Sequence, residues 1–126
     1  MGNREILITA DNTRIEAELN DSAAAGLIFE KLPLEAFVSK WGEEIYFTLP
    51  VKTDMRNPVE TVEEGDIAYW PGGPAFCIFF GQTPISSGGK IIPAGPVELI
   101  GRVSSELELL REIPAGSGIT VAKRGE

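Results

Sequence analysis

Residues 75–80 read Ala-Phe-Cys-Ile-Phe-Phe, and this segment decides the fold class. Every side chain in it is apolar, whereas a strand with one solvent-facing side alternates apolar and polar residues. The segment follows Pro71-Gly72-Gly73-Pro74, a sequence typical of a sharp connection between two strands. It therefore predicts a β-strand that is buried on both faces.

Other segments with strand character flank this one along the whole chain. In 14–19, Ile15, Ala17 and Leu19 alternate with charged residues, which is the period of a strand with one wet face. Turn residues at 11–12 join it to 5–9, so these two segments are expected to form a hairpin. The full set of predicted strands is 5–9, 14–19, 34–41, 45–49, 66–70, 75–80, 97–103 and 119–123.

One segment has helical rather than β character. Ser22 and the two residues before it are N-cap residues, and apolar residues near helical spacing follow until Pro33. We predict a short helix over about 22–32 and a further helical turn over about 105–110. Residues 81–96 are rich in Gly, Pro and Ser and predict one long loop. About eight short strands with a single real helix favour a mostly β, closed β-barrel, which hides its strand edges.

Length and composition limit what this barrel can do. The 126 residues (13.6 kDa) suit one domain, 1–126, and a net charge of −8 argues against nucleic acid as a partner. The absence of histidine excludes Ser-His-Asp and Cys-His catalysis and histidine zinc sites, and no cofactor is expected. A single cysteine and the lack of a long apolar run predict a soluble, cytoplasmic protein without membrane contact.

The densest group of aromatic residues lies around the connection before 75–80. Tyr69 and Trp70 end one predicted strand, Phe76 begins the next, and Phe80 shares a strand face with Phe76. Aromatic side chains are equally typical of a ligand pocket and of a barrel end closed by its own core. We predict that these four residues bind a ligand at the barrel mouth, with Trp70 and Phe76 facing one groove.

Carboxylates offer weaker candidates for a site. Glu43 and Glu44 are adjacent in a hairpin and point to opposite faces, so a tight turn with a solvated acidic tip is favoured over an acid/base pair. The acidic residues of 60–66 lack the spacing of a calcium loop, and a solvated charged turn is favoured there.

Two further side chains have a reactive or charged group. Cys77 lies within the apolar segment and, without a histidine to activate it, is predicted to be an inert hydrophobic residue. Arg56 is the only basic residue in the presumed mouth loops of the middle segment. Its guanidinium is suited to donate to a substrate carbonyl, although an ion pair with Asp54 is the more frequent role of such a residue.

Three runs of the sequence, in this order, resemble a family of small prokaryotic cyclophilin-like proteins. They are Trp-Gly-Glu-Glu-Ile-Tyr-Phe at 41–47, Gly-Asp-Ile-Ala-Tyr-Trp-Pro at 65–71 and Phe-Phe-Gly-Gln-Thr-Pro at 79–84. The resemblance extends over nearly the whole chain and implies a reduced form of the cyclophilin-type β-barrel.

Cyclophilins isomerise X-Pro bonds with an apolar proline pocket and an arginine, but their Phe-His-Arg and Phe-Met-x-Gln-Gly-Gly motifs are absent here. The resemblance therefore transfers no catalytic residue, and Arg56 stands as a catalytic candidate on charge and position alone. The predicted function is binding of a small molecule or an extended, proline-containing peptide at the barrel mouth. The alternatives are a peptidyl-prolyl isomerase with a degenerate site and a structural domain that forms a homo-oligomer.

Overall fold

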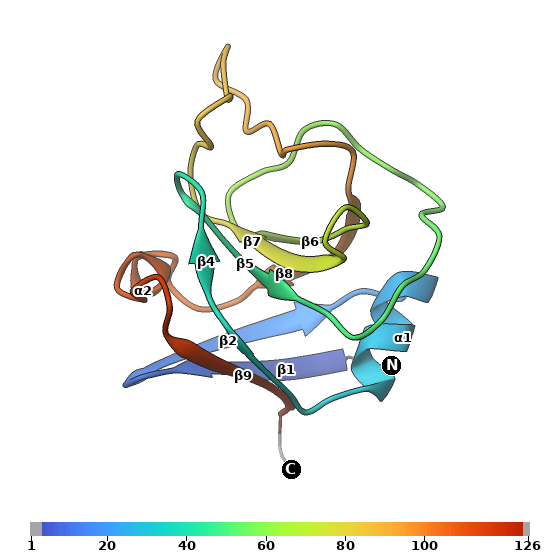
Figure 1. The fold of residues 1–126 in the computed structure, drawn as a ribbon, viewed down its shortest axis with the longest axis vertical. Helices are drawn as coiled ribbons and strands as arrows, with labels where there is room; N and C mark the ends of the chain where they lie inside the picture. The colour runs from blue at the N-terminus through green and yellow to red at the C-terminus, as the bar shows by residue number, and fades with distance from the viewer. Residues whose placement is uncertain (1–3, 125–126) are drawn as a thin grey trace.

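The computed structural model describes residues 4–124, which form nine strands and two short helices (Figure 1). The strands are β1 (Arg4–Ala10), β2 (Thr13–Leu19), β3 (Leu34–Phe37), β4 (Ser39–Lys40), β5 (Glu44–Thr48), β6 (Asp66–Trp70), β7 (Ala75–Phe79), β8 (Glu98–Val103) and β9 (Gly118–Lys123). The helices are α1 (Ala23–Glu30) and α2 (Glu108–Arg111). The predicted mostly β fold is confirmed.

All nine strands of the described chain belong to one antiparallel sheet, in the order β3-β9-β1-β2-β8-β6-β7-β5-β4. The two end strands, β3 and β4, are consecutive in the chain and are separated only by the buried Val38. The Val38 N–H donates to the Ser117 carbonyl (2.9 Å), and its carbonyl accepts from the Gly116 N–H (2.7 Å). The chain thus crosses from one end of the sheet to the other and nearly closes the barrel. This crossing splits the predicted strand 34–41, so nine strands form instead of about eight.

The barrel interior is filled by one apolar cluster, which we call the inner cluster. It includes the inward side chains of β6 and β7, namely Ile67, Tyr69, Phe76 and Ile78. Phe76 stacks on Phe47 of β5, with ring centroids 4.8 Å apart. Side chains therefore occupy the inside of the barrel, as expected for a barrel of this size.

A second apolar cluster lies on the outer face of β6 and β7, and we call it the outer cluster. Its members are Val62, Ala68, Ala75, Cys77, Phe79, Ile91 and Val97. Alternate residues of β7 point to opposite faces, and all five of its residues are buried. The prediction that this strand is buried on both faces is confirmed.

Two long connections cover the outer face. Residues 49–65 join β5 to β6, residues 80–97 join β7 to β8, and the two pair at Val59–Val97 and Val62–Ile91. Figure 1 shows them in green and in yellow to orange, beyond β6 and β7 at the top of the view. The predicted long loop at 81–96 is confirmed, and it packs on the sheet as a cover.

The helices are short, and their buried side chains, Ile28 of α1 and Leu110 of α2 among them, belong to the inner cluster. In α1 the Ser22 hydroxyl caps the helix by accepting from the Ala25 N–H (3.2 Å), within the predicted range of 22–32. The second helix, α2, forms near the predicted turn at 105–110. Within residues 4–124, no helix has the length and apolar character needed to cross a membrane.

Candidate functional site

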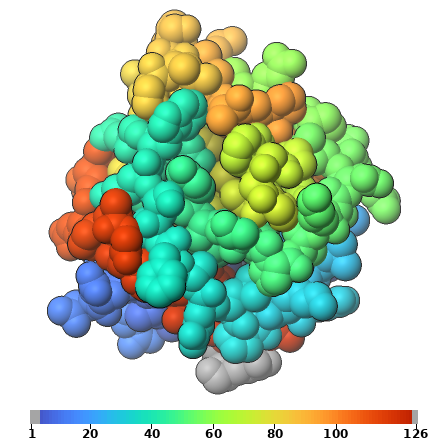
Figure 2. All heavy atoms as spheres, viewed as in Figure 1, coloured from blue at the N-terminus to red at the C-terminus, as the bar shows by residue number. Residues whose placement is uncertain are grey.

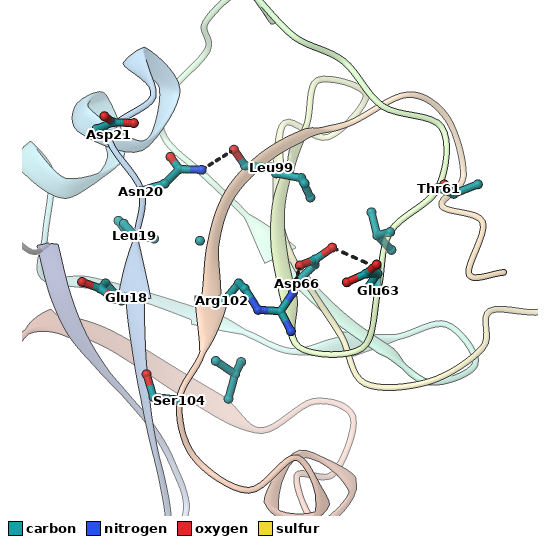
Figure 3. Close-up of a pocket in the computed structure, with 13 residues that line it drawn as sticks. Glu18, Leu19, Asn20, Asp21, Thr61, Glu63, Asp66, Leu99, Arg102 and Ser104 are labelled. Carbon is teal, nitrogen blue, oxygen red and sulfur yellow. Dashed lines mark hydrogen bonds and ion pairs between the residues drawn. The ribbon is translucent and has the colours of Figure 1, made fainter.

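Two hollows in the surface are candidates for a binding site. The larger, of about 840 Å³, is a groove between the end of β2, strand β8 and the connection that precedes β6 (Figure 3). Its walls mix polar residues, among them Glu18, Asn20, Asp66 and Arg102, with apolar ones such as Leu19, Leu99 and Val103. We call it the β2–β8 groove.

Three of the polar side chains that line the β2–β8 groove, Asn20, Asp66 and Arg102, have partners in the groove wall. Arg102 forms an ion pair with the buried Asp66, which also accepts from the Glu63 N–H (2.8 Å). Asn20 donates through Nδ2 to the Leu99 carbonyl (2.9 Å), as Figure 3 shows. These contacts brace the connection against β8. The walls of the groove are polar and apolar in similar measure, whereas small-molecule pockets are usually lined mainly by apolar side chains.

The smaller hollow, of about 160 Å³, lies on the outer face of β5 and β7, and we call it the outer-face pocket. It is formed where three separate parts of the chain meet: 41–46, Trp70 with the outward residues of β7, and 93–97. Figure 2 shows the teal, yellow-green and orange surfaces of these parts in contact. The pocket borders the outer cluster and is separated from the inner cluster by the sheet.

The walls of the outer-face pocket are mainly aromatic. Trp41, Tyr46, Trp70 and Phe79 supply four rings, and Pro93, Ala94 and Val97 of the covering loop supply apolar contacts. The polar side chains at the pocket are Glu44 and Cys77. An apolar wall with one or two polar groups is the usual composition of a small-molecule site.

Strand pairing explains how Glu44 reaches this pocket. Glu44 pairs with Phe79 and Tyr46 pairs with Cys77, so all four side chains share the outer face of β5 and β7. The preceding turn depends on Gly42, which has φ +61° and leaves no room for a side chain. A Cβ there would lie 2.8 Å from the Gln82 carbonyl oxygen.

The two neighbouring glutamates have opposite surroundings. Glu43 forms an ion pair with Arg111 and accepts from the Gln82 N–H (3.3 Å). Glu44 is only 5% exposed, and within residues 4–124 it forms no ion pair. The predicted opposite orientation is correct, but the predicted solvated acidic tip is wrong for Glu44. The loop at 80–97 packs over the hairpin and removes this carboxyl from water.

Burial has a direct electrostatic consequence for Glu44. Desolvation disfavours the charged carboxylate and raises the pKa of Glu44 from 4.5 to about 7, and a hydrogen bond from the Cys77 thiol opposes part of this rise. The pKa of the Cys77 thiol is raised well above its usual value, first by burial and then by the neighbouring Glu44. Cys77 is therefore a protonated, buried thiol, which agrees with its predicted inert character.

The covering loop is itself held in place by hydrogen bonds. The buried Thr83 hydroxyl donates to the Ile92 carbonyl (2.6 Å), and the Ser86 hydroxyl accepts from the Ile92 N–H (3.0 Å). The Thr83 N–H also donates to Ser86 Oγ (3.0 Å). These bonds tie the two arms of the loop together, so one wall of the pocket is formed before any ligand arrives.

The structure places three of the four predicted aromatic site residues in the inner cluster. Tyr69 is 1%, Phe76 0% and Phe80 3% exposed. The Tyr69 hydroxyl accepts from the Thr53 N–H (3.0 Å), and the Arg111 guanidinium lies over the Phe80 ring (5.5 Å). These side chains stabilise the barrel, and they line neither hollow described above.

Trp70 is the predicted residue that does line a pocket. It pairs with Ala75, whereas Tyr69 pairs with Phe76, so Trp70 and Phe76 lie on opposite faces of the sheet. The prediction that Trp70 and Phe76 flank one groove is therefore wrong. The connection between β6 and β7 joins them in sequence, but strand alternation separates their side chains.

Arg56 lies on the exposed connection between β5 and β6. Its backbone N–H and that of Asn57 donate to the buried Glu98 carboxylate, which fixes the path of the loop. In the described part of the chain the Arg56 side chain forms no ion pair, including with Asp54. It does not line the outer-face pocket.

No group of three or more His, Cys, Asp or Glu side chains within residues 4–124 is arranged to hold a metal ion. In the acidic segment 60–66, Asp66 instead forms the ion pair with Arg102 that braces the β2–β8 groove.

The sequence does not predict Trp41, Glu44, Tyr46 and Phe79 as pocket residues. The sequence does contain a signal for this face. Because 75–80 is apolar on both faces, its outward residues need a cover, and the pocket lies under that cover. The missing information was the pairing of β5 with β7, which places Glu44 and Tyr46 beside Cys77 and Phe79.

Comparison with known proteins supports the resemblance inferred from the sequence. The sequence model of a family described as cyclophilin-like matches residues 4–122. The solution structure of a hypothetical protein from Archaeoglobus fulgidus is similar, with a TM-score of 0.81 and 35% sequence identity. The matched region covers 96% of this chain and 95% of that one. No curated protein matches the sequence.

Proposed function

This chain belongs to the cyclophilin-like family, and from that premise we propose that it is a binding domain whose outer-face pocket holds a small organic molecule. The observation that carries the proposal is the meeting of four aromatic rings and a buried carboxyl group in one hollow of about 160 Å³. Aromatic walls supply apolar contact area, and a few polar groups fix the orientation of a ligand. The small volume favours a compact molecule over an extended peptide.

The barrel around the pocket supports the same proposal. The pocket walls come from strands and from a hydrogen-bonded loop, so little ordering is needed when a ligand binds. The role predicted for Trp70 is kept, with Trp41 and Tyr46 as its partners in place of Tyr69 and Phe76. The isomerase alternative has no such support, because Arg56 and the pocket rings do not share a site among the described residues.

Tryptophan fluorescence provides a direct test. The chain contains two tryptophans, Trp41 and Trp70, and both line the pocket, so a fluorescence change on ligand addition reports on this site. A library of small fragments should contain compounds that change this signal. Calorimetry should then show that Trp70→Ala weakens the best compound at least about tenfold, since stacking on a ring contributes on the order of 1 kcal/mol or more.

A matched control is Glu18→Gln, which alters the β2–β8 groove and leaves the outer face intact. Binding should be unchanged in this variant, and far-ultraviolet circular dichroism should be unchanged in both. If the best compounds bind Trp70→Ala as tightly as the wild type, or if Glu18→Gln abolishes binding, the proposed site is wrong.

A further inference from the structure

We infer that the outer-face pocket takes a small organic cation, an ammonium compound whose charged head lies among the aromatic rings and beside the Glu44 carboxylate. This inference rests on the proposed function and names the class of ligand.

The charge distribution at the pocket is one-sided. Glu44 is its one acidic side chain, and no Lys or Arg lines it. The arginines that form ion pairs within residues 4–124 do so elsewhere, as Arg102 does with Asp66 and Arg111 with Glu43. Glu44 is therefore a buried acid without a cationic partner, and a buried charge is costly until it is paired. A bound cation would supply that partner.

The aromatic walls favour the same class of ligand. The faces of Trp, Tyr and Phe rings carry negative potential and attract cations, most strongly where water is excluded. Trp41, Tyr46 and Trp70 surround a site that the covering loop already shields. A neutral apolar molecule would also gain from the rings, but it would leave Glu44 without a cationic partner. Together, the rings and the carboxylate favour a ligand that carries a positive charge.

A metal ion fits this pocket poorly. Calcium requires six to eight oxygen ligands, and magnesium usually keeps several waters along with its carboxylates. The pocket offers a single carboxyl group, and the neighbouring Cys77 thiol is protonated because burial raises its pKa. An organic ammonium ion needs no ligand set of this kind, because methyl or methylene groups around the nitrogen contact the rings directly.

Binding of a cation should depend on pH. Burial raises the pKa of Glu44 to about 7, so this group is mostly charged at pH 8 and mostly neutral at pH 6. The other titratable side chains at the pocket are Cys77 and Tyr46, and the adjacent Glu43 faces Arg111 on the opposite side. If only the charged form binds, the apparent affinity rises about tenfold from pH 6 to pH 8, in proportion to the competent fraction.

Choline and its neutral isostere 3,3-dimethylbutan-1-ol test the inference. Both carry the same branched head, but a carbon atom replaces the charged nitrogen in the alcohol. Titration at pH 8, followed by tryptophan fluorescence and calorimetry, should give an affinity for choline at least about tenfold higher than for the alcohol. Glu44→Gln should reduce this preference, because the rings still attract the cation but the carboxylate no longer pairs with it. The matched control Glu43→Gln keeps an oxygen at the same place and should leave it unchanged.

The possible outcomes separate this inference from the proposed function. A preference for choline that is reduced in Glu44→Gln supports the inference. In the wild type, a smaller preference at pH 6 than at pH 8 supports it without any variant. Equal binding of the two compounds, or a preference as large in Glu44→Gln as in the wild type, overturns the cation inference and leaves the pocket proposal standing. Failure of choline to bind at millimolar concentration also overturns it, while the fragment screen still decides whether the pocket binds any ligand.

Discussion

The two faces of β6 and β7 bury apolar side chains in different ways. On the inner face Tyr69, Phe76 and Ile78 are almost completely inaccessible and pack against strands from the rest of the barrel. On the outer face Trp70 is half-buried, and a loop rather than a strand provides the cover. Close packing inside leaves no space for a ligand, whereas the loop leaves a hollow of about 160 Å³.

This difference separates stability from binding within the same two strands. The inner face is expected to account for most of the free energy of folding, because the inner cluster is much the larger of the two. The outer face combines a pocket, aromatic rings and a carboxyl group that folding places in an unfavourable environment. Residues that reduce stability for no structural benefit are frequently found at functional sites.

The largest expected effect on stability comes from removing the Phe76 ring, which lies on the inner face. Phe76→Ala should lower the free energy of unfolding by about 3–5 kcal/mol, because the lost contacts and the remaining cavity add together. Urea denaturation followed by circular dichroism measures this change. A loss of less than about 1 kcal/mol would contradict the assignment of this ring to the stabilising core.

The second effect is a pH dependence of stability that comes from Glu44 on the outer face. The folded protein holds a proton on Glu44 up to about pH 7, while the unfolded chain releases it near 4.5. Stability should therefore fall as pH rises through this window, by up to about 1.4 kcal/mol per pH unit, and level off above it.

Glu44→Gln lacks this titration, so the difference in unfolding free energy between the variant and the wild type should grow in favour of the variant from pH 5 to pH 8. Urea denaturation at several pH values measures it, and Glu43→Gln is the control. A difference that stays constant with pH would show that Glu44 titrates normally and that the carboxyl group is solvated.

A smaller effect on stability is expected for Trp70, whose ring lies on the outer face. Trp70→Ala should cost about 1–2 kcal/mol, because the side chain is half-buried and lies on a face covered by a loop. The comparison with Phe76→Ala in the same denaturation experiment is the informative quantity. Equal losses in the two variants would mean that both faces contribute alike to the core.

The smallest effect is predicted for Arg56→Ala. The loop is anchored through the Arg56 backbone N–H and Glu98, which the substitution keeps, so stability should change by less than about 0.5 kcal/mol. Exchange spectroscopy on an Ala-Pro peptide should show the same cis/trans exchange rate with wild type, with the variant and without protein. Acceleration by the wild type that is lost in Arg56→Ala would restore the isomerase alternative.

Much of the fold was predictable because local patterns and burial agree. Strict alternation in 14–19 and the fully apolar 75–80 specify one-sided and two-sided burial, and the structure confirms both. The break at Val38 was not predictable, because it depends on hydrogen bonds to 116–117, far away in the sequence.

The site was less accessible to sequence analysis. Trp70 and Phe76 are close in the chain, and their separation onto two faces follows from the register of β6 with β7, which a sequence does not state. Glu44 has the sequence surroundings of a solvated turn residue, because its cover comes from loop residues about fifty positions further along the chain. Sequence proximity thus grouped side chains from two faces: Trp70 lines the outer-face pocket, and Tyr69, Phe76 and Phe80 belong to the inner cluster.

The central claim is that ligands bind at the outer-face pocket, and mapping of NMR chemical shifts tests it most directly. A compound from the fragment screen is titrated into ¹⁵N-labelled protein, and the backbone amide and tryptophan indole signals are followed. We predict that the largest changes fall on both indole signals and on the amides of 41–46, 77–79 and 93–97. Changes concentrated at 18–21, 61–66 and 101–104 would place the binding site in the β2–β8 groove and contradict this account.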